Sequence, residues 1–418
     1  MSGKRLSTLQ RAVFAVLAIA ASVSGLYFAR NSGANPEAYS NDFNVYYHAA
    51  REVIAGRDPY QHSLGDWTPY IYPPLLAELI VPLAFLPLPV ASYLWFLISA
   101  GSIVAAAWMS ASLATEKHGS AVTERHAAES PAWRAALACC AVVLVIRFVL
   151  DTFNLGQVNA VVAALAVAHV YLYARDRKAL SAVALVIAVS IKLTPALLLL
   201  YHVGKLRLKF AIACAALLVA VTAMSFLPFG PRGTDAFQTF WSRTVKNEQG
   251  YDFAYSGNQS LRGAIARMIG HRSEYTGDEG ASREPADLPT ILISIGLLAL
   301  AVFAAVRARS ELAAAAPFFC CLVLLSPLSW KAHYVILILP AAYLLSRTKA
   351  SGGARLLIAT TLGAAFVLFN LTSPRVIGVA AGEWSDSHSL VVGGALLVFV
   401  ACMAGVLMRK FGKQPDVC

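Results

Sequence analysis

The sequence predicts an all-α protein that crosses a membrane many times. Of its 418 residues, 58% are hydrophobic and 14% are charged, whereas soluble domains carry roughly 25% charged residues. Long apolar runs recur along the chain, and about 20 apolar residues span a bilayer as a helix. Short Lys and Arg clusters separate these runs, as the positive-inside rule expects of cytoplasmic loops. The net charge of +11 therefore indicates membrane orientation rather than nucleic-acid binding.

The first apolar run covers about 12–29 and follows Lys4, Arg5 and Arg11. It is long for a signal peptide, and no clear small-residue cleavage site follows it. We therefore expect an uncleaved first span with its basic end in the cytoplasm. The segment 30–71 then lies outside the membrane.

A short amphipathic helix is predicted in this outer segment, beginning near Asp42. Ser40 or Asn41 can cap its start, and Gly56 can end it. Such a helix lies in the membrane interface with its apolar face toward the lipid, which places Asp42 on a helix N-terminus beside the bilayer. Its apolar face follows the i, i+3, i+4, i+7 spacing and consists of Phe43, Tyr46, Tyr47, Ala50, Val53 and Ile54, with Asn44, His48, Arg51 and Glu52 mostly opposite.

The next apolar segment, 72–87, is short and bracketed by prolines, so it either crosses the membrane or re-enters from the outer face. The basic clusters 175–178 and 205–209 are the best cytoplasmic markers in this half. Placing both inside requires that 72–87 does not cross and that 179–204 forms a hairpin of two short helices, broken near Pro195. In the rival topology 72–87 crosses and 179–204 is a single span. We favour the first topology.

The remaining apolar runs obey the charge rule and give one integral-membrane domain over 1–418, with about 11–13 transmembrane helices and short interfacial helices on the outer face. A second outer segment is expected at 229–287. The other expected spans are about 90–113, 134–150, 210–228, 288–306, 312–328, 333–346, 354–372 and 389–408.

In this topology the unusual polar residues gather at the outer face, whereas the inner turns carry only generic Lys and Arg. Polar groups at the edge of hydrocarbon are costly and mark a candidate functional site. No spacing of His, Asp and Glu indicates a metal site. The outer polar set comprises Asp42, Tyr72, Gln157, Asn159, Lys192, Asn258, Gln259, Lys331 and His333.

The charged members of this set each admit two interpretations. Asp42 can be a general base that its helix N-terminus keeps ionised. It can also be an acid that only stabilises the helix through the helix dipole. Lys192 lies deep in an apolar run, which suits a clamp for a phosphate or a lysine that snorkels to the interface. His333 suits hydrogen bonding to a phosphate or hydroxyl, or an interfacial histidine beside Trp330.

The amide residues of the set also admit two interpretations. Gln157 and Asn159 stand at the start of a predicted span, where they can bind sugar hydroxyls or simply cap the helix. Asn258 and Gln259 lie in the second outer segment and allow the same two roles.

Six motifs occur in order over about 40–345: DFNVYY with GRDPY at 42–60, YPP through PLAFLP at 72–87, GQVN at 156–159, IKLTP at 191–195, NQSL at 258–261 and LSPLSWKAH at 325–333. Together they resemble the polyprenyl-phosphate-sugar-dependent glycosyltransferases of the GT-C type, and among these glycosyltransferase family 87, which contains bacterial α-1,2-mannosyltransferases.

The resemblance implies inverting transfer of a hexose, with mannose expected, from a polyprenyl-phosphate donor to a hydroxyl of a lipid-linked or glycan acceptor. It implies that Asp42 is the general base, on the extracytoplasmic side of a bacterial plasma membrane, and that no metal or cofactor takes part. A departing phosphate needs a cation, for which Lys192 and His333 are the candidates. The role of Lys331 stays open. The further substrate-binding candidates are Tyr46, Tyr72, Gln157, Asn159, Asn258 and Gln259.

Two other functions remain as alternatives. A transporter or lipid flippase needs a polar route to both faces, whereas the inner half of each span is nearly uniform Ala, Val, Leu and Ile. A polymerase or ligase that joins lipid-linked glycans shares a one-sided site and more often needs several outer arginines; it is kept open by Arg232, Arg243, Arg262, Arg267 and Arg272.

Overall fold

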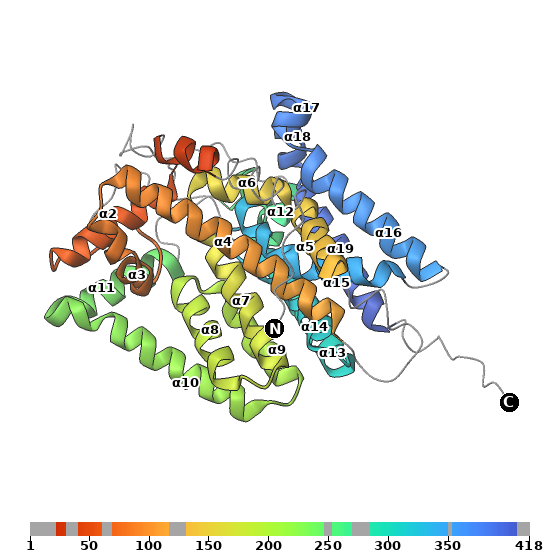
Figure 1. Ribbon diagram of the computed structural model, residues 1–418, viewed down its shortest axis with the longest axis horizontal. Coiled ribbons are helices and arrows are strands. Elements are labelled where there is room, and N and C mark those ends of the chain that lie inside the picture. The colour runs from red at the N-terminus through yellow and green to blue at the C-terminus, as the bar shows by residue number, and fades with distance from the viewer. Residues whose placement is uncertain are drawn as a thin grey trace, which may run out of the picture.

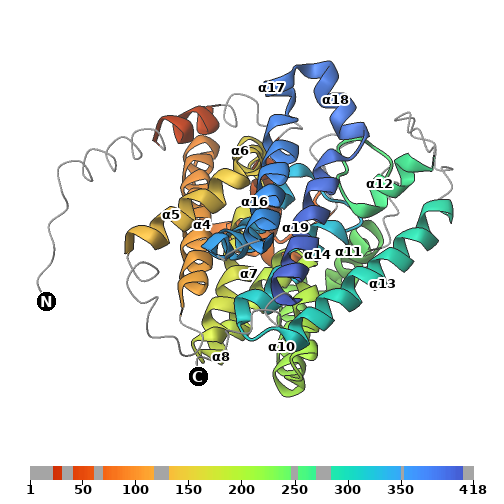
Figure 2. The ribbon, with the colours of Figure 1, turned by 90° about the vertical axis from the view of Figure 1, so that its right-hand side faces the viewer.

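A computed structural model describes residues 22–30, 41–60, 69–116, 131–245, 253–269, 284–349 and 353–407. The described residues form a bundle made almost entirely of helices (Figures 1 and 2), and the chain is an all-α polytopic membrane protein, as the composition predicts. Most of the expected first span, 12–29, and most of the expected inner loop, 114–133, lie outside the described residues.

In chain order the helices are α2 (Asp42–Ile54), α3 (Pro74–Ala84), α4 (Leu88–Thr115), α5 (Pro131–Leu144), α6 (Ile146–Leu155), α7 (Asn159–Ala174), α8 (Lys178–Ile191), α9 (Leu198–Gly204), α10 (Leu208–Ser225), α11 (Gly233–Phe240), α12 (Leu261–Met268), α13 (Glu284–Arg307), α14 (Glu311–Leu324), the 3-10 helix η5 (Lys331–Leu337), α15 (Ile338–Ser346), α16 (Gly353–Phe366), α17 (Pro374–Ile377), α18 (Val379–Ser387) and α19 (Leu390–Leu407).

Within the described part of the chain, four helices are both long and apolar enough to cross a bilayer: α4, α10 with its 3-10 continuation, α13 and α19. The pair α5 and α6, bent by 68°, gives a fifth. Seven further apolar helices are shorter, at 10–17 residues. Helix length alone therefore does not test the expected total of 11–13 spans, because short helices can be joined across breaks.

Helix α2 begins and ends where the sequence predicts. The side chain of Asn41 caps it by accepting a hydrogen bond from the backbone N–H of Phe43 at 3.0 Å, and Gly56 follows its end with a φ of +66°. The predicted apolar residues Phe43 and Tyr46 are fully buried. Asn44, expected on the polar face, is also fully buried. α2 is packed against α3 and α4, so the Asn44 part of its polar face meets protein, whereas Arg51 on the same face is exposed.

Helix α3 covers most of the segment 72–87 and favours the topology in which this segment does not cross the membrane. Its 11 residues rise by about 16 Å, which is about half of the hydrocarbon thickness of a bilayer. It packs against α2 and α8 instead of extending across the bundle. The segment is therefore a short helix at the same end of the molecule as α2, as the favoured topology requires.

The chain reverses between α8 and α9, as the predicted hairpin requires. Lys192, which follows α8, contacts Asn159 at the start of α7. His202 in α9 instead contacts His169, near the other end of α7. The two basic clusters 175–178 and 205–209 consequently lie at the same end of the bundle.

Helices α17 and α18 were not predicted, because the segment between the last two apolar runs is short and has no clear apolar periodicity. They stand at the top of the views in Figures 1 and 2, close to one another. The expected spans of the second half otherwise correspond to α13, α14, η5 with α15, α16 and α19.

Two large apolar clusters, and a third small one around α12, hold the described part of the bundle together. The larger is assembled mainly from α4 to α7, α14, α15 and α19. The other large cluster surrounds α2 and α3 and contains the buried aromatic residues Phe43, Tyr46, Tyr60, Tyr70 and Trp95. This aromatic cluster positions the start of α2, where Asp42 lies.

Candidate active site

A glycine turn brings the start of α2 against the start of α7. Gly156 ends α6 with a φ of +63°, which glycine adopts without strain. Its carbonyl accepts a hydrogen bond of 2.8 Å from the indole N–H of Trp95. A Cβ atom on Gly156 would lie 2.6 Å from Oδ1 of Asn41 and 2.9 Å from Cβ of Phe43. The residues on either side of Asp42 are thus in direct contact with the turn.

Replacing Gly156 by Ala is therefore expected to disturb the packing of this turn against the start of α2, where Asp42 lies. The new methyl group meets the N-cap side chain of α2, and the positive φ adds a strain of about 1 kcal/mol. We expect a lower unfolding temperature and reduced transferase activity in membranes. Gly101→Ala is the matched control, since a Cβ there meets nothing within 4 Å. Equal activity and stability in the two variants would show that this contact does not position Asp42.

The carboxylate of Asp42 lies in a mostly buried polar environment. Burial raises its pKa to about 6, and this rise is limited by the positive charge of Lys192 and by hydrogen bonds from Gln157 and Tyr46. The residue as a whole is half-buried. A carboxyl with a pKa near 6 is a stronger base than an ordinary aspartate at about 3.9.

Lys192 stands where α8 breaks, with extended backbone at the helix C-cap. Its ammonium donates to Oδ1 of Asn159 at 2.8 Å and lies 2.7 Å from Nε2 of His333. The amide of Asn159 in turn donates to Oε1 of Gln157. Asp42, Gln157, Asn159, Lys192 and His333 therefore form one continuous polar chain from four parts of the sequence.

Two tyrosines form an aromatic wall beside this chain. The rings of Tyr46 and Tyr72 meet edge to face with centroids 5.0 Å apart. The hydroxyl of Tyr46 accepts a weak hydrogen bond from the backbone N–H of Val158 at 3.4 Å, and Nζ of Lys192 lies 5.9 Å from the centroid of Tyr72. The predicted residues Tyr46 and Tyr72 are thus next to the carboxylate and the ammonium.

The predicted residues Asn258 and Gln259 lie apart from this chain and bind backbone. The Asn258 amide donates to the carbonyls of Phe253 and Pro327 at 3.0 and 3.1 Å, and its oxygen accepts from the N–H of Ser329 at 2.9 Å. The Gln259 amide donates to the carbonyl of Asp386 at 2.8 Å. These contacts hold the segment that leads into η5, and hence the position of His333.

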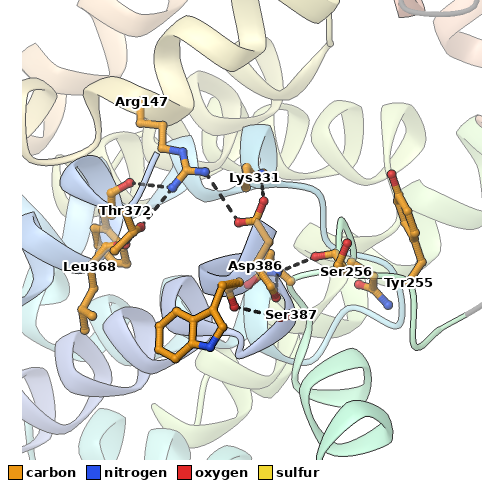
Figure 3. A network of polar contacts seen from close by, with 12 residues as sticks. Arg147, Tyr255, Ser256, Lys331, Leu368, Thr372, Asp386 and Ser387 are labelled. Carbon is orange, nitrogen blue, oxygen red and sulfur yellow. Dashed lines mark hydrogen bonds and ion pairs between the residues drawn. The ribbon is translucent and has the colours of Figure 1, made fainter. Parts of the chain in front are cut away.

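Lys331, whose role the sequence left open, pairs with Asp386 of α18 at 2.5 Å (Figure 3). The other oxygen of Asp386 lies 3.6 Å from Nη2 of Arg147, which also donates to Oγ1 of Thr372 at 3.2 Å. This buried network joins α6, η5 and α18. Sequence reasoning missed it, although an arginine within the apolar run before Asp151 was a signal.

The outer arginines of the polymerase alternative are only partly described. Arg262 forms an ion pair with Asp287, and Arg267 donates to the carbonyls of Tyr255 and Asn258, each at 2.9 Å. Both arginines are therefore bound to groups of the protein itself. Arg272 lies outside the described residues.

The arrangement suits transfer of a group from a phosphate to an alcohol. A carboxylate is available to accept a proton, and an ammonium is available to meet a phosphate oxygen. An ammonium has three N–H donors, of which two are directed at Asn159 and His333. Among the described residues, no group of three or more His, Cys, Asp or Glu side chains is placed to hold a metal.

The chain is similar in sequence to known glycosyltransferases. The model of glycosyltransferase family 87 matches residues 70–327, more than half of the chain. The chain is 30% identical, over 71% of its length and 68% of the relative, to a polyprenol-phosphate-mannose-dependent alpha-(1-2)-phosphatidylinositol mannoside mannosyltransferase of Mycolicibacterium smegmatis. It is 28% identical, over 94% of its length and 84% of the relative, to a polyprenol-phosphate-mannose-dependent alpha-(1-2)-phosphatidylinositol pentamannoside mannosyltransferase of Mycobacterium tuberculosis.

The helical bundle, its polar site and these matches define an integral-membrane glycosyltransferase. The chain belongs to glycosyltransferase family 87. The resemblance seen in the six motifs is thereby confirmed at the level of the family.

Proposed function

We propose that the chain transfers mannose from a polyprenyl-phosphate donor to a hydroxyl of a mannosylated glycolipid, with inversion at the anomeric carbon. The observation that carries this proposal is the polar chain that joins the Asp42 carboxylate to the Lys192 ammonium through Gln157 and Asn159. The donor and the kind of acceptor are taken from the relatives, whose names specify polyprenol-phosphate mannose and phosphatidylinositol mannosides.

In this mechanism Asp42 removes the proton of the acceptor hydroxyl while the oxygen attacks the anomeric carbon. The new C–O bond forms on one face of the sugar as the bond to the phosphate oxygen breaks on the other. A single displacement of this kind inverts the anomeric centre, so an α-linked product requires a β-linked donor. Gln157 and Tyr46 hold the carboxylate in place through their hydrogen bonds.

Lys192 and His333 act on the departing polyprenyl phosphate. Negative charge grows on its oxygens as the bond to the sugar breaks, and a nearby cation stabilises the transition state more than the ground state. The third N–H of Lys192 is available for one of these oxygens. His333, at 2.7 Å, fixes the direction of the ammonium. Asn258, Gln259 and Lys331 contribute by holding η5, from which His333 projects.

We place this site on the extracytoplasmic side of the plasma membrane. The clusters 175–178 and 205–209 lie at the end of the bundle away from Asp42, and basic clusters mark the cytoplasmic side. A lipid-linked donor then reaches the site sideways from the outer leaflet, along the short helices α2 and α3. Cysteine labelling of Arg57→Cys and Lys178→Cys from outside intact cells, in a variant without the native cysteines, tests the orientation, with only the first position expected to react.

The rate of transfer should depend on pH through Asp42. Because burial raises its pKa to about 6, Asp42 is protonated and inactive below this pH. The value of kcat/KM is expected to rise with pH through about 6. Since Lys192 lowers the pKa of Asp42, Lys192→Met is expected to move this rise to higher pH. A profile that is flat between pH 5 and 7 would contradict Asp42 as the base.

The direct test uses purified protein with a short-chain polyprenyl-phosphate mannose and a synthetic phosphatidylinositol mannoside. The expected product carries one added α-linked mannose, seen by mass spectrometry and by the anomeric coupling in the NMR spectrum. Transport of the intact donor across vesicles without any transfer would favour the flippase alternative and exclude the proposal.

A further inference from the structure

A second polar cavity lies at the opposite end of the bundle from Asp42. Its volume is about 200 Å³, and it is formed where α4, α14, α15 and α19 end or begin. α4 links the two ends, since Trp95 binds the Gly156 turn behind Asp42 and Glu116 lines the cavity. The helix rises by about 30 Å between these residues, which matches the hydrocarbon core of a bilayer. The cavity therefore opens at the other membrane face.

The charge of the cavity is strongly positive. Arg307, Arg309 and Arg347 line it, from the end of α13, from the residues between α13 and α14, and from the segment that follows α15. The acid within the described lining, Glu116, forms an ion pair with Arg175 and so is already neutralised. Three arginines thus line a small space, and the acidic residue of the described lining has a partner of its own.

Arg347 gives an independent sign that the cavity can bind a hydrogen-bond acceptor. Its Nε is buried and has no hydrogen-bond partner among the described residues. A buried donor of a charged group without a partner is costly. An acceptor that enters the cavity would remove this cost, and guanidinium groups bind phosphate oxygens through paired N–H donors.

The rest of the lining is mixed: Ser310, Tyr343 and Ser346 are polar, and most of the other residues are apolar. Leu113, Leu312 and Val406 contribute hydrocarbon walls directly beside the arginines. A cavity that is cationic at its mouth and apolar along its side matches an amphiphile better than a free ion. Basic pockets between membrane helices commonly hold lipid head groups at the cytoplasmic face.

We propose that this cavity binds a phosphate group, carried by an anionic phospholipid of the leaflet opposite the active site. Arg347 and Arg309 bind the phosphate oxygens, and the apolar wall contacts the glycerol and the start of the acyl chains. The site is separate from the transfer chemistry and does not depend on the function proposed for Asp42.

Binding can be measured by native mass spectrometry of the full chain, purified in a neutral detergent. The probes are dioleoyl phosphatidylglycerol, dioleoylglycerol, which lacks the phosphate, and inorganic phosphate. We expect phosphatidylglycerol to bind, dioleoylglycerol to bind at least about tenfold more weakly, and Arg347→Gln to weaken phosphatidylglycerol binding by about tenfold. Arg177→Gln is the control, because Arg177 is exposed on a neighbouring inner turn outside the cavity lining.

Equal binding by the Arg347→Gln variant and the parent chain, or equal binding of dioleoylglycerol, would overturn the proposal. Saturable binding of inorganic phosphate without retained lipid would overturn the phospholipid as the source while keeping the phosphate site. If Arg347→Gln does not fold, as judged by gel filtration, the exposed Arg309→Gln replaces it. Unchanged binding there, with the Arg177→Gln control also unchanged, would equally contradict the site.

Discussion

Replacing Asp42 by Asn is expected to lower the rate of sugar transfer by about a hundredfold to ten-thousandfold, the usual contribution of a general base. Asparagine has the same shape and still reaches Gln157 and Tyr46, but it cannot take the proton of the acceptor hydroxyl. The protein level should therefore stay unchanged while activity is lost. The measurement is transfer of labelled mannose in membranes that contain equal amounts of each variant.

Glu52→Gln provides the control for this experiment. Glu52 lies on the same helix as Asp42 but at its other end, where it pairs with Arg57 at 2.5 Å. Arg57 is 61% exposed, and ion pairs of this exposed kind contribute little to stability. The control should keep its activity. Substantial transfer by Asp42→Asn, at a level close to that of Glu52→Gln, would remove Asp42 as the base.

Replacing Lys192 by Met is expected to lower kcat by about a hundredfold to a thousandfold, similar to the loss of one group that stabilises charge in a transition state. Methionine keeps most of the length of the side chain but has no charge. It also leaves Oδ1 of Asn159 and Nε2 of His333 without the donor seen at 2.8 and 2.7 Å. The KM of the donor should rise, whereas the KM of the acceptor should change little.

Lys178→Met is the control, because Lys178 is at the opposite end of α8 and its side chain is 58% exposed. It should behave like the parent chain. An unchanged kcat and donor KM in Lys192→Met would exclude a role for Lys192 on the phosphate. A loss confined to the acceptor KM would assign Lys192 to the acceptor side instead.

Local sequence signals predicted α2 and the hairpin of α8 and α9 because both depend on neighbouring residues. Asn41 and Gly56 carry the chemistry that begins and ends α2, and Pro195 interrupts the helical hydrogen bonds after Lys192. The positive-inside rule predicted that the two basic clusters lie on the same side, and the structure has both at one end of the bundle. These inferences needed no knowledge of distant contacts.

Contacts between distant segments could not be predicted from the local sequence. Asn44 was expected to face water but is buried, because α3 and α4 cover α2. The network of Arg147, Asp386 and Lys331 joins residues up to 239 positions apart, and Asp386 lies in a helix that has no apolar pattern. Nothing in the local sequence tells which charges pair across such separations.

The sequence by itself determined that the chain is a helical membrane protein and which family it resembles, since hydrophobicity, charge and short motifs are local properties. Tertiary structure alone decided that Lys192 meets Asn159 and His333, and that the Gly156 turn carries Asp42 to Gln157. The physical reason is that helix packing in three dimensions, rather than spacing along the chain, sets the distances between polar groups within a bundle.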